Sequence, residues 1–343
     1  MSSIFLRIML LLPMFFPAFL GWVPGRDAAS PAIRSIAVPN VSSGEPRFTF
    51  SVLSDIHITP WDGESHRRLR QALSDHAALF PQSSLMALNG DLTNGNDEDY
   101  RSLFKLLGET PHAPVQAAMG NHEYYRIWRA PDGGMDTSKL HPAWSSEKAV
   151  RLFTSYFGYE KPYHDLWLHG FHFIFLGGEA YRDAVPGIGD DAFLSGRQLQ
   201  WLEKKLAQLP PKGEIKGAKQ PENRQPVFVF LHQPLPRTVD GTDHARGVVQ
   251  EKALRSLLDR HPEAILFSGH THWDLERTKQ IKRLSFLAVG SSSVRQVFNR
   301  RDEPEINAKS QSLAVEVFDR RIVIRGRDHA SKRWIEPAYT LTW

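Results

Sequence analysis

Short apolar stretches of this 343-residue chain repeatedly end in residues that can bind metal ions. The stretch "FSGHTHW" carries His270 and His272 two positions apart, so both side chains point to the same side of an extended chain. The stretch "FSVLSDIHI" carries Asp55 and His57 with the same spacing. Three further apolar runs end in the remaining members of the set, which are Asp91, then Asn121, His122 and Glu123, and then His232.

Each of these residues taken alone has an ordinary structural explanation. An aspartate can begin a turn, and a single histidine at a strand end is more often a hydrogen-bonded structural group than a ligand. A purely structural explanation must account for five coincident placements, however, while other histidines such as His66, His164 and His244 mostly occupy predicted loops and helices. Ligands of open α/β sheets bind outside the carboxyl ends of the strands, so the set predicts one shared site.

The donor types indicate metal chemistry without thiolates. The chain has no cysteine, which excludes disulfides, thiolate metal sites and cysteine nucleophiles. Three oxygen donors from aspartate or asparagine and four imidazoles suit two divalent cations such as Mn, Fe or Zn. Two cations about 3.5–4 Å apart activate water and hold both oxygens of an in-line phosphoryl displacement. Gly90, Gly120 and Gly269 each precede a member of the set and are expected to allow close backbone approach and unusual φ angles.

Strand-like and helix-like stretches alternate along the body of the chain, which indicates the α/β class. Apolar runs at 47–53, 83–91 and 113–121 predict strands, and amphipathic stretches at 65–80 and 98–109 predict helices between them. This order implies parallel strands with helices packed on the sheet. The second half repeats the theme, with strands at 171–178, 225–233, 263–269, 283–290, 312–318, 321–326 and 339–343 and helices at 195–209 and 250–260.

Local signals refine these elements. Gly108 is expected to end the helix at 98–109. Ser195 and Gln198 form a predicted capping box at the start of the helix at 195–209. Residues 126–145 and 210–224 are expected to be long surface loops.

The N-terminal residues differ from the rest of the chain. The stretch "MSSIFLRIMLLLPMFFPAFLGWV" carries one charge, and its uncharged run is short for a membrane span and contains Pro13 and Pro17. Residues 1–25 are therefore expected to be a signal peptide or an uncleaved anchor, and either predicts an exported protein, in the periplasm, outside the cell or at its surface. Residues 26–46 are rich in Pro, Ser and Gly and predict a linker to a domain at 47–343.

The charge balance gives no specific signal for a nucleic-acid partner. Lys plus Arg number 42 and Asp plus Glu number 38, and no dense basic run occurs in the sequence. Contact with a membrane is expected only through residues 1–23, if they are not cleaved.

Five ordered blocks of the sequence resemble the calcineurin-like metallophosphoesterases, whose pattern is D-x-H, G-D, G-N-H, a single H and G-H-x-H. The blocks here are "DIH", "GD", "GNHE", His232 and "GHTH", all within residues 47–295. Each block alone is a weak signal, and the ordered set is very specific. The resemblance implies a metallo-dependent phosphatase-like fold, which is a four-layer α/β/β/α sandwich of two mixed β-sheets flanked by helices. The strand-rich C-terminal part, 283–343, agrees with that fold.

The resemblance also implies a role for each residue of the set. Seven would be ligands of two divalent cations: Asp55, His57 and His272 for the first, Asn121, His232 and His270 for the second, and Asp91 bridging both. The nucleophile would be a metal-bridging hydroxide. His122 would not be a ligand but would bind a phosphate oxygen and protonate the leaving group, so His122 and Asp91 are the implied catalytic residues.

Two positions depart from patterns found within the superfamily. Asn94 stands three residues after Asp91, where purple acid phosphatases have a metal-ligating tyrosine. Ser/Thr protein phosphatases have there an aspartate that orients the catalytic histidine, followed by an arginine. The local sequence "GDLTNGN" lacks both features, which moves the expected function away from protein phosphatases. Glu123 replaces an aspartate often seen after G-N-H and is expected either to orient a neighbouring group or to lie at the surface.

The sequence therefore predicts metal-dependent hydrolysis of phosphate esters, either monoesters or diesters, on a small-molecule or polymer substrate. Arginines in 124–144 and 234–247 are candidate phosphate contacts, and a solvated loop charge is the alternative for each. A second hypothesis is a catalytically weak or inactive protein of the same fold that binds metal or phosphate at the cell surface. No ligand position is visibly substituted, which argues against that hypothesis.

Overall fold

The computed structural model describes residues 44–130, 134–208, 225–243, 247–305 and 308–343. The predicted signal peptide or anchor, most of the predicted linker and the predicted loop at 210–224 lie outside these residues. Residues Gly44–Trp343 form one compact unit. Among the described residues, no helix is both long enough and apolar enough to cross a membrane.

Two mixed six-stranded sheets build the unit. The first has the order β12-β11-β10-β1-β2-β3 and consists of β1 (Phe48–Leu53), β2 (Leu85–Asn89), β3 (Val115–Ala118), β10 (Gln311–Val317), β11 (Arg321–Asp328) and β12 (Arg333–Thr342). The second has the order β4-β5-β6-β7-β9-β8 and consists of β4 (His164–Leu168), β5 (Phe171–Phe175), β6 (Val227–Phe230), β7 (Ala264–Ser268), β8 (Ile281–Arg283) and β9 (Leu287–Gly290). Strands β1, β2 and β3 are parallel, as predicted, and so are β5, β6, β7 and β9.

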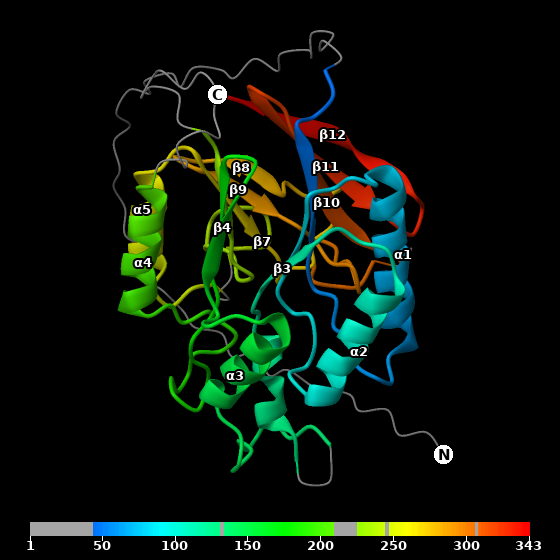
Figure 1. Cartoon of the computed structure of the whole chain (residues 1–343). Coiled ribbons are helices and arrows are strands. Elements are labelled where there is room, and N and C mark those ends of the chain that lie inside the picture. The colour runs from blue at the N-terminus through cyan, green and yellow to red at the C-terminus, as the bar shows by residue number, and fades with distance from the viewer. Residues whose placement is uncertain (1–43, 131–133, 209–224, 244–246, 306–307) are drawn as a thin grey trace, which may run out of the picture. The chain divides into compact units, whose positions relative to one another are not determined.

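Helices cover the outer faces of both sheets. They are α1 (Gly63–Leu79) and α2 (Asp97–Glu109) on the first sheet, and α4 (Gly196–Leu206) and α5 (Glu251–Asp259) on the second. Helix α3 (Ser146–Phe157) packs against the 3₁₀ helix η1 (His122–Trp128). Leu69 of α1 and Leu103 of α2 pack in one buried cluster with Leu88 of β2. Helices α4 and α5 pack on the second sheet, on the opposite side of the two sheets (Figure 1). The predicted four-layer sandwich is confirmed.

A third apolar cluster fills the space between the sheets and is rich in phenylalanine. In β1 the alternation of the strand points Phe48, Phe50 and Val52 inward to the second sheet. The ring of Phe50 lies 4.8 Å from that of Phe228 and 5.2 Å from that of Phe173, in edge-to-face contacts. This packing joins the sheets next to the edge at which β1, β6 and β7 end.

Several local predictions need correction. The run 283–290 is not one strand, because Leu284 N–H donates to Phe286 C=O in a tight turn that separates β8 from β9. Helix α2 continues through Gly108 to Glu109. The run 126–145 begins inside η1 rather than in a loop, and neither α3 nor β4 was predicted.

The capping box at α4 forms only in part. Ser195 Oγ accepts from Gln198 N–H at 3.2 Å, as predicted. The Gln198 side chain does not return to the Ser195 backbone. It bonds both backbone groups of Gly177, and Glu179 accepts from Ser195 N–H instead. A buried tertiary contact therefore takes the place of the local one.

Replacing Asp75 of α1 by alanine is expected to lower the free energy of unfolding by about 3–5 kcal/mol, because buried Arg327 would lose its partner. Asp75 accepts from Arg327 Nε at 2.7 Å, from Arg327 Nη2 at 2.9 Å and from His329 Nδ1 at 2.8 Å. Urea denaturation measures the loss. Asp319→Ala is the control, because that side chain is 86% exposed in its pair with Arg47 and is expected to change stability by less than about 1 kcal/mol.

The ion pair between Asp75 and Arg327 also determines how the effect of Asp75→Ala on stability changes with pH. Burial raises the pKa of Asp75, but Arg327 and His329 outweigh it and hold that pKa well below its usual range. A depressed carboxyl pKa contributes stability above its unfolded-state value, and the contribution is lost as the pH falls through the native value. The difference between wild type and Asp75→Ala should therefore shrink in acid, and a difference that grows in acid would contradict the assignment.

Candidate metal centre

The predicted site residues meet at one edge of the two sheets. The first sheet contributes the segments after β1, β2 and β3, and the second sheet contributes those after β6 and β7. Backbone hydrogen bonds tie these segments together, since His57 N–H donates to Asp91 C=O at 3.0 Å and Gly269 N–H donates to His232 C=O at 2.9 Å. His232 Nδ1 also donates to Asn89 C=O at 2.8 Å, which joins the two sheets directly below the site.

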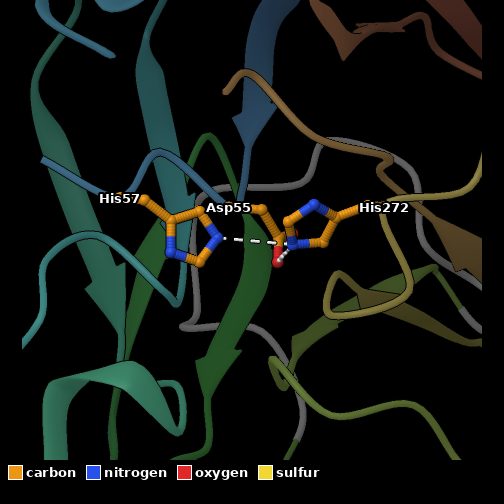
Figure 2. A group of neighbouring side chains, drawn as sticks. All are labelled: Asp55, His57 and His272. Atoms are coloured by element: carbon orange, nitrogen blue, oxygen red, sulfur yellow. Dashed lines mark hydrogen bonds and ion pairs between the residues drawn. The ribbon is translucent and has the colours of Figure 1, made fainter. Parts of the chain in front are cut away.

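Asp55, His57 and His272 form one group of donors (Figure 2). Their donor atoms all lie within 4.8 Å of one another. His272 Nε2 is 2.9 Å from Asp55 Oδ1, and the Nε2 atoms of His57 and His272 are 3.3 Å apart. Figure 2 shows the two imidazoles and the carboxylate pointing toward a common point.

Asp91, His232 and His270 form a second group with the same spread of donor atoms. His232 Nε2 is 3.1 Å from Asp91 Oδ2 and 3.9 Å from Asp55 Oδ1, so the two groups are adjacent. The structure thus brings Asp55, His57, Asp91, His232, His270 and His272 together in two neighbouring clusters.

The chemistry of these donors fits metal ions. His232 Nε2, His270 Nε2 and Asn121 Oδ1 are buried and have no hydrogen-bond partner, which is costly unless a cation binds them. His272 Nδ1 donates to Gln296 C=O at 2.8 Å and His232 Nδ1 donates to Asn89 C=O, so Nε2 of each ring is the nitrogen that faces the centre and can bind a cation once it is deprotonated. Asn121 Nδ2 donates to Tyr125 OH at 3.1 Å, which leaves its oxygen for a cation.

The backbone at the site is strained in a way that supports a functional role. Asp55, His57, Asp91, His270 and His272 all have positive φ angles between 52° and 70°. Such angles are uncommon for residues other than glycine, and they persist where the surrounding structure imposes them, often at active sites.

The glycines before three ligand positions allow close approach, as predicted. A Cβ atom on Gly120 would lie 2.3 Å from Asp91 Oδ1, and one on Gly269 would lie 1.9 Å from Ser54 Oγ. Of the three glycines, only Gly90 has a positive φ, so the expectation of unusual angles holds for that one alone.

Glu123 is fully buried, which corrects the surface alternative for this residue. Its carboxylate accepts backbone N–H groups from Asp91 at 3.0 Å, Leu92 at 2.8 Å and Gly120 at 2.7 Å. It therefore fixes the loop that carries Asp91. Burial and the charge of Asp91 raise the pKa of Glu123 to about 7.

His122 forms a third group of neighbouring donors with His57 and Asp91, and its Nε2 lies 3.8 Å from Asp91 Oδ2. Its Nδ1 is 2.8 Å from Asn94 Oδ1, so the amide oxygen orients the ring. Tyr125 stacks on the same imidazole with ring centroids 3.9 Å apart. Asn94 was flagged in the sequence only as a departure from two patterns, and the structure shows that it contacts His122.

The carboxylates and imidazoles of the centre shift one another's pKa values. Burial raises the pKa of Asp55, but His272 and His232 outweigh it and leave that pKa at about 2. Burial lowers the pKa of His232, but Asp91 and Asp55 outweigh it and raise that pKa to about 10. A divalent cation at these ligands would displace the proton on His232, so cation binding should weaken in acid.

A cavity of about 680 Å³ opens at the centre. Arg295 lines it, although no motif in the sequence marked that residue. The candidate arginines that the structure describes are engaged elsewhere, because Arg126 stacks on Trp144, Arg129 pairs with Glu98, and Arg237 pairs with Glu251. Of the described arginines in the two candidate loops, none lines the cavity.

Comparison with known proteins agrees with this geometry. The family model described as calcineurin-like phosphoesterase matches residues 48–274. A probable glycerophosphodiester phosphodiesterase GpdQ from Arcobacter nitrofigilis is 24% identical over 211 residues, which are 60% of this chain and 63% of that protein. The chain thus spans less than two thirds of the length of this relative.

Solved structures share the fold. A dimetal phosphatase from Danio rerio superposes with a TM-score of 0.59 and 15% identity, over 87% of this chain and 100% of that one. A purple acid phosphatase from yellow lupin (Lupinus luteus) superposes with a TM-score of 0.51 and 12% identity, over 86% of this chain and 53% of that one. Because the family model spans well over half of the sequence, the protein belongs to the calcineurin-like phosphoesterase family.

Proposed function

We propose that the chain hydrolyses phosphate monoesters or diesters at a binuclear metal centre, with His122 as the acid for the leaving group. The observation that carries the proposal is the pair of donor clusters that lie side by side, with Asp91 within reach of His232, His270 and His122. In-line phosphoryl displacement needs charge neutralisation on both sides of the phosphorus, and adjacent cations supply it.

The ligand assignment follows from the two clusters. Asp55, His57 and His272 would hold one divalent cation, Asp91 would bridge, and the second cation would take three ligands with buried, unpartnered atoms: Asn121, His232 and His270. Mn, Fe and Zn all suit this mixture of nitrogen and oxygen donors. When bound, the pair of cations supplies an activated water and stabilises charge on the phosphoryl group.

The side chains around the centre position the metal ligands and supply a proton to the leaving group. His122 Nε2 faces the cavity, because Asn94 holds Nδ1 and Tyr125 supports the ring face. From there His122 contacts a phosphoryl or leaving-group oxygen and gives up its proton as the ester bond breaks. Glu123 and Tyr125 act on the ligands, Glu123 through the backbone of Asp91 and Tyr125 through the Asn121 amide.

Replacing Asn94 by alanine is expected to lower kcat about tenfold or more, because the His122 ring loses the acceptor that fixes its tautomer and orientation. Asn94→Asp keeps an oxygen in the same place and is expected to recover most of the rate. Steady-state kinetics on an alkyl phosphoester measures both. Equal rates for wild type and Asn94→Ala would show that the 2.8 Å contact does not serve catalysis.

Metal depletion tests the proposed function directly. Chelation is expected to abolish turnover of p-nitrophenyl phosphate and of its bis ester, and Mn²⁺, Fe²⁺ or Zn²⁺ is expected to restore it. The ratio of the two restored rates separates monoesterase from diesterase. The glycerophosphodiesterase relative makes diesters of small alcohols the first natural substrates to test. Turnover that survives complete chelation would refute the proposal.

We propose in addition that residues 1–25 direct export. The uncharged run with two prolines supports this. N-terminal sequencing of the chain recovered from the cell envelope or medium is expected to begin after residue 23, whereas an intact Met1 in the cytosolic fraction would contradict export.

A further inference from the structure

The cavity reaches well beyond the donor clusters. Besides ligands it is lined by Trp61 and Asp62 from the turn before α1, and by Arg295 and Phe298 from the segment after β9. Its volume of about 680 Å³ falls in the range of pockets that hold whole small molecules, and a phosphoryl group alone would leave most of it to water. The walls away from the centre are therefore available to another part of a substrate.

Trp61 offers an unused aromatic face to that region. Its side chain is the most exposed of the large apolar residues in the described chain, at 69%. The other aromatic rings on the cavity wall are already stacked, Tyr125 on His122 and Phe298 on His272. Trp61 has no ring or cation–π contact with another described residue. An indole exposed at a pocket is suited to stacking on a planar group of a ligand.

Arg295 offers an unused hydrogen-bonding edge. Its Nε donates to Asp62 Oδ2 at 2.7 Å, and Nη2 lies 3.5 Å from Asp62 Oδ1. Asp62 Oδ1 is also the cap of α1 and accepts N–H groups from Glu64 and Ser65. Arg295 Nη1 has no hydrogen-bond partner among the described residues. The guanidinium is thus held in place by one edge and is free at the other.

Arg295 is also the cation of this region. Of the described residues that line the cavity, it is the only lysine or arginine. A fixed guanidinium with free N–H groups binds phosphate oxygens well, because planar donors match them and little side-chain freedom is lost.

We propose that Trp61 and Arg295 form a second subsite, which binds an aromatic ring and a further phosphate on the part of the substrate that is not cleaved. The chemical class is a phosphoester that carries both groups, as a nucleoside diphosphate does. The ring stacks on Trp61 and the further phosphate pairs with Arg295. This inference rests on the proposed function, since it assumes that the scissile phosphoester lies at the donor clusters.

Competitive inhibition separates the two contacts. Ribose 5-phosphate, AMP and ADP add first an aromatic base and then a second phosphate to the same sugar phosphate. Each is expected to inhibit hydrolysis of bis(p-nitrophenyl) phosphate by the Mn²⁺-loaded full chain. Trp61→Ala is expected to raise the Ki of AMP about fivefold or more and to leave the Ki of ribose 5-phosphate within about twofold. Arg295→Gln is expected to raise the Ki of ADP about tenfold relative to that of AMP.

Matched variants control for general effects. Met135→Ala removes an exposed apolar side chain outside the cavity, and Arg67→Gln removes an exposed arginine of α1 that pairs with Glu64. Both should keep the wild-type order of Ki values. If Arg295→Gln does not fold, Arg295→Lys is the second variant. It keeps the positive charge but lacks the planar guanidinium that Asp62 holds in place, so it should still lose most of the preference for ADP over AMP.

The outcome that overturns the subsite differs from the one that overturns the function. Equal changes for all three inhibitors, or no change, in Trp61→Ala and Arg295→Gln would refute the subsite while hydrolysis by the wild type stood. Absence of hydrolysis by the wild type with every cation would refute the proposed function. The Kd values of the same three probes, measured by calorimetry for the wild type and the variants, would then test the subsite through the ratios between probes that are given above for Ki.

Discussion

Replacing Asp91 by asparagine is expected to lower kcat by about a thousandfold or more and to reduce bound metal below two ions per chain. Asp91 Oδ2 is 3.1 Å from His232 Nε2 and 3.8 Å from His122 Nε2, so the carboxylate contacts His232 and lies close to His122. Asparagine has the same shape but no charge, so its amide would hold two adjacent cations much more weakly than the carboxylate. Cations contribute several kcal/mol of transition-state stabilisation, and each 1.4 kcal/mol is about tenfold in rate.

Elemental analysis and steady-state kinetics on the same preparation measure both effects of Asp91→Asn. Asp319→Asn is the matched control, because the Asp319 side chain is 86% exposed and pairs with Arg47 rather than with a residue of the centre. A circular dichroism spectrum and melting temperature near those of the wild type would show that the variant is folded. Wild-type turnover with full metal content in Asp91→Asn would remove the bridging role.

Replacing His122 by alanine is expected to lower kcat by about a hundredfold to ten-thousandfold on alkyl phosphoesters, while the metal content stays the same. The ring is positioned by Asn94 and Tyr125 but belongs to neither set of assigned ligands. A general acid matters most when the leaving group is strongly basic. The loss should therefore be much smaller for p-nitrophenyl esters, whose leaving group is stable without a proton.

The contrast between two substrates is the readout for His122→Ala, because a structural defect would slow both equally. His112→Ala, an exposed histidine, serves as the control and should leave both rates unchanged. Loss of bound metal in His122→Ala would instead place the residue among the ligands. An equal loss on alkyl and p-nitrophenyl esters would contradict the role of leaving-group acid.

The sequence was sufficient to predict most of the strands, although not β4, and the edge at which the donors meet, whereas the two-sheet arrangement was implied by the family resemblance. Five apolar runs of strand length ended in Asp, Asn or His, and parallel strands place their carboxyl ends at one edge. The repeated i, i+2 spacing in "DIH" and "GHTH" put pairs of donors on one side of the chain. These features are local, so a single sequence can carry them.

Contacts that depend on tertiary packing could not be predicted in the same way. Arg295 follows β9 in "SSSVRQ", which has no pattern that indicates a cavity. The link from Asn94 to His122 depends on how the loop after β2 lies against η1. The Gln198 side chain bonds the two buried backbone groups of Gly177 instead of the Ser195 backbone. By contrast, the signals for α3 are present in the sequence, with Ser145 at its start and Gly158 at its end.

Titration of the metal-free chain with Mn²⁺ tests the central claim most directly. Two adjacent donor clusters, with Asp91 proposed to bridge the cations, predict that turnover of bis(p-nitrophenyl) phosphate rises until two equivalents are bound per chain. His122→Ala should bind the same two equivalents without comparable turnover. Full activity at one equivalent or with no bound cation would contradict the binuclear account.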